Sequence, residues 1–299
     1  MHKIYIPTFR RVDSQITFNS LPDKYKENAI LVVQRHERPQ HKHKAKYLIV
    51  EDGIGIAETR KKIIDHAGKS RFFIFDDDVQ FYRRNIKYLM KENWELDLFD
   101  SDMEDHGLPR KFTKRPMTEG DFDEMIEIFN TWMDTENIIQ IGYRSAMLPP
   151  SWRFYTDFTD LYTGYMINGA EVSKFVDDVD WTYVRVGEDS MMSLEFLLRG
   201  YKIRRSELFC IQPKWWQEGG CSEWRDAKLH NEEHKKLMDK YPKYVYFKKE
   251  IKRSNIGIIK DYRYRWKEAY RSYYTKQIRE CLASNNSLLE TVPYFKYIE

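Results

Sequence analysis

The sequence predicts an α/β fold in which helices flank a mostly parallel central sheet. Short apolar runs recur in the N-terminal half and helical patterns separate them, which is the first observation behind this prediction. The second is that Pro, Gly or Asp bounds each run, as expected for strands buried on both faces. A strand, a helix and a strand in succession form a βαβ unit, which places its two strands parallel in one sheet.

The elements follow in order along the chain. The predicted strands of the N-terminal half are residues 3–7, 29–34, 46–52 and 71–78. Residues 56–68 form the helix of the βαβ unit, because their apolar residues recur at helical spacing and Gly68 is a typical C-cap. Further predictions are a helix over 120–134, strands over 138–142 and 162–169, a helix from 188 that Gly200 ends before another strand, and helices over 230–242 and 258–283.

The charge distribution suggests how the chain is organised. Residues 95–136 hold 13 acids and 4 bases, whereas residues 243–279 hold 12 bases and 3 acids. We therefore expect a catalytic domain over 1–215 with an acidic insertion at 95–136. A helical, aromatic and basic C-terminal extension over 216–299 is expected to pack on that domain and to offer a positive face to an anionic partner.

Composition excludes several classes of protein. Apolar residues make up 41% of the 299 residues and charged residues 32%, and no window is apolar for long enough to span a membrane. The N-terminus lacks a signal-peptide pattern. Cys210, Cys221 and Cys281 are scattered without CxxC spacing, so neither a disulfide framework nor a thiolate zinc site is expected. A reducing, cytoplasmic setting follows.

Three consecutive acids, Asp76, Asp77 and Asp78, stand where the strand 71–78 ends. Ligands of parallel sheets bind beyond the carboxyl ends of the strands. On an extended segment Asp76 and Asp78 project to the same side and Asp77 points away. Two close carboxylates raise each other's pKa unless a cation neutralises them, and Mn²⁺ or Mg²⁺ is the fitting cation. The sequence predicts a metal–diphosphate site here; the alternative is a triplet that only caps the strand and begins a turn.

Five short motifs, in this order, resemble the GT-A glycosyltransferases over about the first 205 residues. They are Pro7-Thr8-Phe9-Arg10-Arg11, Glu51-Asp52-Gly53, the run from Gly55 to Arg60, Asp76-Asp77-Asp78, and Glu188-Asp189 with Gly200-Tyr201. With Ile167-Asn168-Gly169 and the Gly219-Gly220…Trp224-Arg225 stretch, they most resemble the TET-associated glycosyltransferases of bacteriophages. This resemblance implies a Rossmann-like GT-A sheet, a nucleotide-sugar donor (a UDP-sugar first), Mn²⁺ or Mg²⁺, and transfer to a hydroxylated pyrimidine such as 5-hydroxymethylcytosine in phage DNA.

The resemblance also implies roles on the donor side. Asp78 would ligate the metal directly, and Asp76 would contact the ribose, the sugar or the water shell of the ion. Thr8, Arg10 and Asp52 would contact the nucleobase or ribose, although Asp52 also suits a simple Asp-Gly turn. Arg60 would grip the diphosphate or hold the carboxylates. The alternative for Arg60 is a surface arginine paired with a neighbouring acid of its own helix.

For the acceptor side, the resemblance implies that the pair Glu188-Asp189 holds the general base, with Asp189 in that role and inversion at the sugar. Acids at a helix start are also favoured by the helix dipole alone, and retaining transfer stays open. His230 is a further candidate metal ligand, four residues before His234; a solvated helix face is the alternative.

The basic tail is the expected nucleic-acid surface, because cations neutralise phosphates and aromatic rings stack on exposed bases. The candidate contacts are Arg225, Arg263, Arg265, Trp266, Lys267 and Arg271. The alternative is an amphipathic helix whose tyrosines pack inward while its cations stay solvated.

Other functions remain open at this stage. A polysaccharide, a lipid-linked sugar or a protein would serve the same chemistry as acceptor. A sugar nucleotidyltransferase also combines a parallel sheet with acids, but it opens with a Gly-rich loop, and residues 7–11 contain no glycine. A non-catalytic nucleic-acid-binding module would leave the acids at 76–78 without a role. The sugar, the donor nucleoside, the acceptor base and the oligomeric state are undetermined by the sequence.

Overall fold

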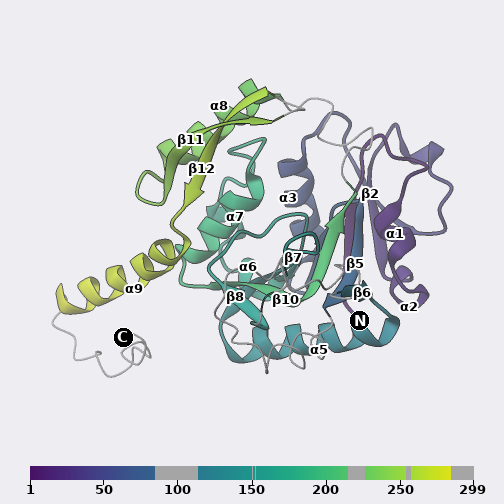
Figure 1. Cartoon of the computed structure of the whole chain (residues 1–299), viewed down its shortest axis with the longest axis horizontal. Helices are drawn as coiled ribbons and strands as arrows, with labels where there is room; N and C mark the ends of the chain where they lie inside the picture. The colour runs from purple at the N-terminus through teal and green to yellow at the C-terminus, as the bar shows by residue number, and fades with distance from the viewer. Residues whose placement is uncertain (85–113, 150, 152, 215–225, 254–256, 284–299) are drawn as a thin grey trace.

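The computed structural model describes residues 1–84, 114–149, 151, 153–214, 226–253 and 257–283. A ten-stranded sheet lies at the centre of this described part (Figure 1). Its order is β3 (Lys46–Val50), β2 (Ala29–Gln34), β1 (Lys3–Pro7), β4 (Arg71–Phe75), β9 (Gly164–Asn168), β7 (Ile138–Ser145), β10 (Lys202–Pro213), β5 (Val79–Arg84) and β6 (Lys114–Pro116), with β8 (Tyr155–Asp157) paired to β10.

Strand direction decides where the chain can build a site. β1 pairs parallel with β2 and β4, and β2 pairs parallel with β3. The carboxyl ends of these four strands therefore lie at one edge of the sheet. β9 runs antiparallel between β4 and β7, with Phe75 opposite Gly164, so β9 begins at the edge where β4 ends. β7 and β10 are again parallel, whereas β5 is antiparallel to β10.

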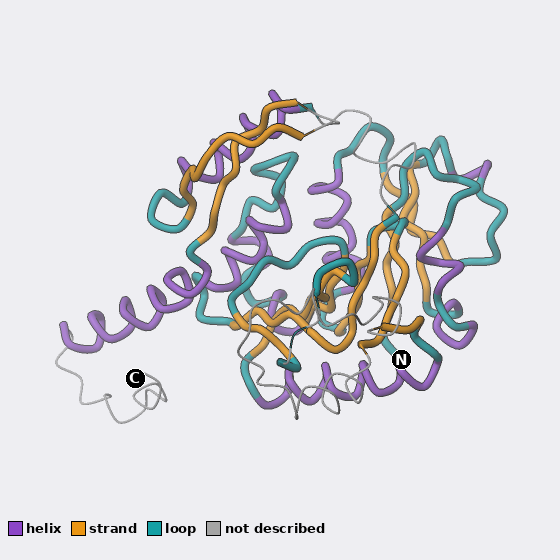
Figure 2. Tube along the Cα trace, viewed as in Figure 1, coloured by secondary structure: helices purple, strands orange, loops and turns teal. Residues whose placement is uncertain are grey.

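Helices cover both faces of the sheet (Figure 2). One face carries α3 (Ile56–Ala67), α6 (Gly169–Val172) and α7 (Glu188–Leu197); the other carries α1 (Ile16–Ser20), α2 (Asp23–Lys26) and α5 (Glu119–Thr135). Alternate residues of β1 divide between the two cores, with Tyr5 in the first and Ile4 and Ile6 in the second. Two short 3-10 helices, Arg38–Gln40 and Val176–Asp178, complete this part.

The sequence pattern anticipates most of these elements. The predicted α/β class and βαβ unit are confirmed by β3, α3 and β4, and Gly68 caps α3 with a φ of 61°. α5 is amphipathic as predicted and begins with a capping box between Thr118 and Asp121. This α/β architecture is compatible with a GT-A fold.

The C-terminal extension is only partly helical. It consists of α8 (Ala227–Lys240), a hairpin of β11 (Val245–Arg253) and β12 (Gly257–Tyr264), and α9 (Trp266–Ala283). The helix predicted over 258–283 is therefore wrong in its first part. Tyrosine and arginine alternate from Tyr262 to Arg265 with a period of two, which is typical of a strand and outweighs helical propensity once β11 supplies a partner.

The extension shares its interior with the sheet. Leu237, Val245, Tyr262 and Trp266 belong to the same apolar core as Tyr5 of β1. Within the described residues, every helix is too short or too polar to cross a lipid bilayer. The domain boundaries stay a prediction.

Gly169 provides a test of this packing. A Cβ at this position would lie 2.3 Å from the backbone carbonyl oxygens of Gly68 and Ser70, which cannot rotate away. We expect Gly169→Ala to lower the free energy of unfolding by about 3 kcal/mol, measured by chemical denaturation.

Gly120→Ala is the matched control. Gly120 is exposed near the start of α5, and the nearest atom to an added Cβ is Thr118 Oγ1 at 4.0 Å. This substitution should leave stability unchanged or raise it by about 0.5 kcal/mol, because alanine favours the helix. Equal denaturation midpoints for the two variants would contradict the packing described.

Candidate active site

The acids at 76–78 form the turn that connects β4 to β5. The backbone N–H of Thr17 donates to the Asp77 carbonyl at 3.1 Å, and the N–H of Lys214 donates to the Asp78 carbonyl at 2.7 Å. Thr17 Oγ1 also accepts from the N–H of Val79. Arg11 contacts both Asp77 and Asp78, so the expectation that Asp77 points away from Asp78 is corrected, whereas the convergence of Asp76 and Asp78 stays a prediction. Asp77 and Asp78 lie in a turn after β4, so the alternation of a regular strand does not apply to them.

Arg11 neutralises two of the three acids. Its Nη1 contacts the carboxylate of Asp77 and lies 3.2 Å from Asp78 Oδ2. Arg11 and Asp77 are both buried, and burial raises the pKa of Asp77 to about 6 although Arg11 opposes the shift. Burial likewise raises the pKa of Asp78.

Arg60 collects carboxylates from two other elements at the same edge. Its Nη1 donates to Glu188 Oε1 at 2.5 Å and contacts the carboxylate of Asp189, while its Nη2 lies 3.4 Å from Asp76 Oδ1. We call this group of one guanidinium and three carboxylates the Arg60 bridge. Arg60 is buried on α3, so the alternative of a surface arginine paired within its own helix is excluded.

Tyr165 of β9 also contacts the Arg60 bridge. Its hydroxyl donates to Asp189 Oδ1 at 2.9 Å, and its ring is fully buried. Burial, assisted by the neighbouring Glu188, raises the pKa of Asp189 to about 6 against the opposing charge of Arg60. Burial also raises the pKa of Asp76 well above its ordinary value, and the charges of Asp189 and Asp78 add to this shift.

The predicted start of α7 is confirmed at Glu188, which places Glu188 and Asp189 in its first turn. Gly187 precedes them with a φ of 86°, and a Cβ there would lie 3.3 Å from His234 Nε2. α8 therefore packs directly against the start of α7. His230 is buried on α8, with its ring 4.1 Å from that of His234, so a solvated helix face does not describe it.

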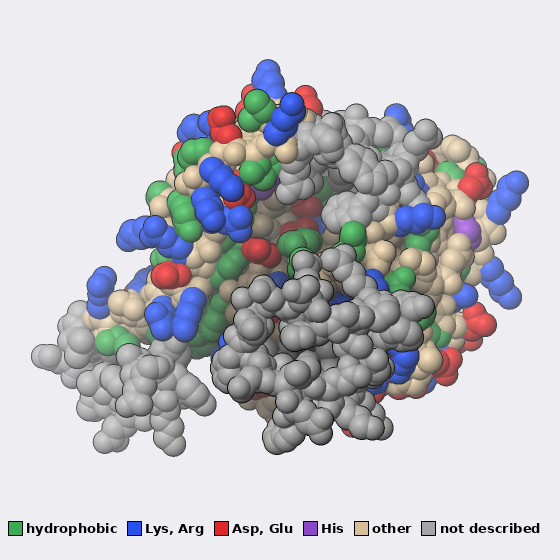
Figure 3. All heavy atoms as spheres, in the orientation of Figure 1, with side chains coloured by type: hydrophobic (Ala, Val, Ile, Leu, Met, Phe, Trp, Pro, Cys, Tyr) green, Lys and Arg blue, Asp and Glu red, His purple; other side chains and the backbone are tan. Residues whose placement is uncertain are grey.

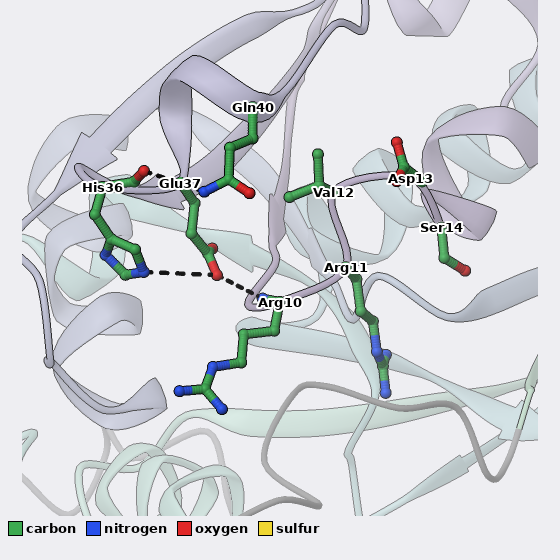
Figure 4. Close-up of a pocket in the computed structure, with 8 residues that line it drawn as sticks. All are labelled: Arg10, Arg11, Val12, Asp13, Ser14, His36, Glu37 and Gln40. Atoms are coloured by element: carbon green, nitrogen blue, oxygen red, sulfur yellow. Dashed lines mark hydrogen bonds and ion pairs between the residues drawn. The ribbon is translucent and has the colours of Figure 1, made fainter.

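A cavity of about 740 Å³ opens beside the acids, at the ends of β1 and β2 (Figure 4). Its lining consists of Arg10, Arg11, Val12, Asp13, Ser14, His36, Glu37 and Gln40. Glu37 is 3% exposed; its Oε1 accepts from the Arg10 N–H at 2.7 Å, and its Oε2 has no hydrogen-bond partner among the described residues. The cavity therefore offers both cationic groups and a buried acceptor oxygen.

The structure separates the three predicted nucleoside contacts. Arg10 adopts a left-handed φ of 54°, and its side chain extends into the cavity (Figure 4). Asp52 does not line the cavity itself. Its Oδ1 lies 2.7 Å from Nδ1 of His36, which does line the cavity, so Asp52 orients that residue. Thr8 is buried outside the lining, where its Oγ1 accepts from Gln15 Nε2 at 2.9 Å.

Residues 2–106 match the TET-Associated Glycosyltransferase family. The match confirms the predicted resemblance, and the protein is a glycosyltransferase by the description of that family. The matched range includes Arg11, Arg60 and Asp76–Asp78, whereas α7 lies beyond it. No curated protein matches the chain.

The acids at this end of the sheet outnumber the arginines that contact them. Five carboxylates at 76–78 and 188–189 face the guanidinium groups of Arg11 and Arg60, which leaves negative charge in excess if all are ionised. Among the described residues, no group of three or more acid, histidine or cysteine side chains is arranged to hold a metal ion by itself. An ion would therefore share its shell with water and diphosphate oxygens, as Mg²⁺ usually does.

Four residues of this site have no role among the sequence-based predictions. Arg11, His36 and Glu37 line the cavity, and Tyr165 contacts Asp189. Arg11 stands in the first motif beside Arg10, so a signal for it existed. Tyr165 lies inside an apolar strand, and Glu37 follows one, and neither position carries a pattern that separates it from an ordinary core or loop residue.

The predicted nucleic-acid residues have different fates. Arg263, Arg265, Lys267 and Arg271 are exposed along β12 and α9, where Lys and Arg side chains gather over the hairpin (Figure 3). Trp266 is corrected: it is 7% exposed, and its Nε1 donates to Asp160 Oδ1 at 2.9 Å, so its ring is not available to a base. Arg225 lies outside the described residues. The tyrosines of α9 pack inward, as the amphipathic alternative expects, with Tyr270 buried.

Removal of the positive charge of Arg60 should destabilise the fold, because the acids around it repel one another. We expect Arg60→Met to lower the free energy of unfolding by about 3 kcal/mol at about pH 7.5, because three partly buried carboxylates lose their counter-charge. The loss should shrink at about pH 5.5. Carboxyls whose pKa is raised in the folded state bind protons there, so their burial costs less as the pH falls.

Lys61→Met on the same helix is the control, because Lys61 pairs with Asp65 at the surface. Its effect should be within about 0.5 kcal/mol at both pH values. Denaturation curves that show the same loss for Arg60→Met at both pH values would contradict the assignment of the Arg60 bridge.

Proposed function

We propose that this glycosyltransferase moves a sugar from a UDP-sugar to the hydroxyl of a 5-hydroxymethylcytosine-like pyrimidine in DNA, in the cytoplasm of the cell that holds that DNA. The Arg60 bridge is the observation that supports the proposal best. One guanidinium contacts both Asp76, at the turn expected to meet the donor, and Asp189, the expected base. The residue expected to meet the donor and the residue expected to activate the acceptor therefore contact the same arginine side chain.

The donor half of the proposal rests on the cavity and the turn beside it. The nucleoside occupies the cavity, where Glu37 Oε2 accepts one N–H or O–H from it. The diphosphate extends toward the turn and is attracted by Arg10 and Arg11. Arg60 Nε is buried without a hydrogen-bond partner among the described residues, so it is available to a phosphate oxygen.

Asp76 and Asp78 are the proposed holders of Mn²⁺ or Mg²⁺. Their carboxylate oxygens are the ligands that such ions prefer, and the excess of acids at this edge favours a cation. When bound, the ion supplies charge neutralisation for the departing nucleoside diphosphate.

On the acceptor side, Asp189 receives the proton. The acceptor oxygen forms a bond to the anomeric carbon while the bond from that carbon to the diphosphate breaks, and the hydroxyl proton passes to the Asp189 carboxylate. A pKa of about 6 leaves Asp189 ionised at neutral pH yet close enough to that pH to accept a proton effectively. Displacement by one nucleophile from the opposite side inverts the sugar.

DNA as the acceptor is supported by charge. The exposed cations lie on β12 and α9, and α9 contacts α7. Phosphates of a nucleic acid would be neutralised there. A target base in a duplex would have to leave the stack to reach Asp189.

A transfer assay tests the proposal. The protein is incubated with Mn²⁺, a panel of nucleotide sugars and DNA that contains 5-hydroxymethylcytosine, and the digested nucleosides are weighed by mass spectrometry. We expect the modified nucleoside to gain one sugar, DNA with unmodified cytosine to gain none, and Asp78→Ala to lose the gain. Absence of transfer from every nucleotide sugar would refute the proposal, whereas transfer to a polysaccharide or lipid alone would refute only the acceptor.

Asp189→Asn tests the base. Transfer should fall by about 10²–10⁴-fold while Mn²⁺-dependent UDP binding persists, because the amide cannot take the proton. In the parent protein the base works only when ionised, so the rate should fall as the pH drops through about 6 and stay level above it. Undiminished transfer by Asp189→Asn would remove Asp189 from this role.

A further inference from the structure

The sheet order separates the donor side of the site from the opposite side. The cavity lies at the ends of β2 and β1, the acids follow at the end of β4, and the next strand is β9. An acceptor that attacks opposite the leaving diphosphate must approach from the side away from the cavity. The segment that enters β9, residues 158–163, occupies that side.

This segment, the β9 entry loop, is attached to the acid turn by its backbone. The N–H of Asp76 donates to the carbonyl of Thr163 at 2.9 Å, which extends the β4–β9 ladder by one residue beyond the pair Phe75 and Gly164. Tyr162 is therefore the chain neighbour of the residue that hydrogen-bonds to the backbone of Asp76.

The β9 entry loop is held at several points. Phe158 donates from its N–H to Ile203, and its ring lies 4.7 Å from that of Tyr270 on α9. Asp160 accepts from Trp266, and Leu161 is buried over Gly142, where an added Cβ would lie 2.6 Å from Leu161 Cδ2. These contacts fix the loop to the sheet and to the C-terminal extension together.

The backbone of the loop is strained at its last residue. Thr163 has a φ of 65°, a conformation that is a genuine outlier for a β-branched residue. Such strain persists where surrounding contacts enforce it, and it concentrates at ligand-binding segments.

Tyr162 stands out on this loop by its exposure. Leu161 before it is buried, yet Tyr162 is 51% exposed. A fixed loop, hydrogen-bonded to Asp76 through Thr163, thus keeps a large aromatic side chain accessible to solvent on the side from which the acceptor approaches.

We propose that Tyr162 is the platform on which the ring of the acceptor stacks. The inference rests on the proposed function, in which that ring is a pyrimidine of DNA. Stacking suits this position because it grips a flat ring by its face and leaves the ring's hydroxymethyl group free to reach Asp189. Through Asp160 and Trp266 the loop also touches the start of α9, whose exposed Lys267 and Arg271 suit the neighbouring phosphates.

The test compares Tyr162→Ala with Tyr162→Phe on a single-stranded oligonucleotide that contains 5-hydroxymethylcytosine. Tyr162→Ala should lower kcat/KM for the oligonucleotide by roughly tenfold or more, mainly through KM, because the stack already forms in the ground-state complex. Tyr162→Phe keeps the ring and should stay within about twofold of the parent. Thermal unfolding and Mn²⁺-dependent UDP binding should be the same in all three proteins.

Each other outcome counts against the proposal. A kcat/KM for Tyr162→Ala that stays within about twofold of the parent would overturn it, and so would a loss of UDP binding or of stability in that variant, since either points to a structural role. A parent protein that glycosylates no DNA overturns the proposed acceptor and this inference together. The two failures are distinguishable because the first requires an active parent.

Discussion

The charge balance around Arg60 is the constraint on which the rest of the site depends. Its guanidinium compensates Asp76 after β4 and the pair Glu188 and Asp189 at the start of α7. These carboxylates are partly buried, and partly buried acids without a counter-charge would bind protons or force the segments apart. The side chain of Arg60 thus connects α3 to the acid turn and to the start of α7. Tyr165 adds a hydrogen bond to Asp189 from the sheet beneath.

Two arginines also explain how the chain tolerates three consecutive acids. Arg11 contacts Asp77 and Asp78, and Arg60 contacts Asp76, so two guanidinium groups share the charge of the triplet. Burial raises the pKa of each of the three acids, and the charge of the contacting arginine opposes that shift. A site with acids left in excess favours a cation, and a donor that brings a diphosphate with its metal ion would complete the balance.

The local features of this arrangement could be predicted from the sequence, whereas the features fixed by contacts between distant residues could not. Strand and helix limits followed from apolar period and from caps such as Gly68, and the helix start at Glu188 followed from its paired acids. The conformation of the acid turn did not follow, because Thr17 and Lys214 set it from far along the chain. Trp266 resembled an exposed stacking residue in sequence, yet its partner Asp160 lies 106 residues away.

A double-mutant cycle between Arg60 and Asp189 measures the central claim most directly. The free energy of unfolding is determined for the parent, Arg60→Met, Asp189→Asn and the double variant at about pH 7.5. The account predicts that Asp189→Asn restores part of the stability lost in Arg60→Met, with a coupling of about 1–3 kcal/mol, because it removes a buried charge that has lost its partner. Strictly additive losses would contradict the account, since they would mean that the two side chains do not depend on each other.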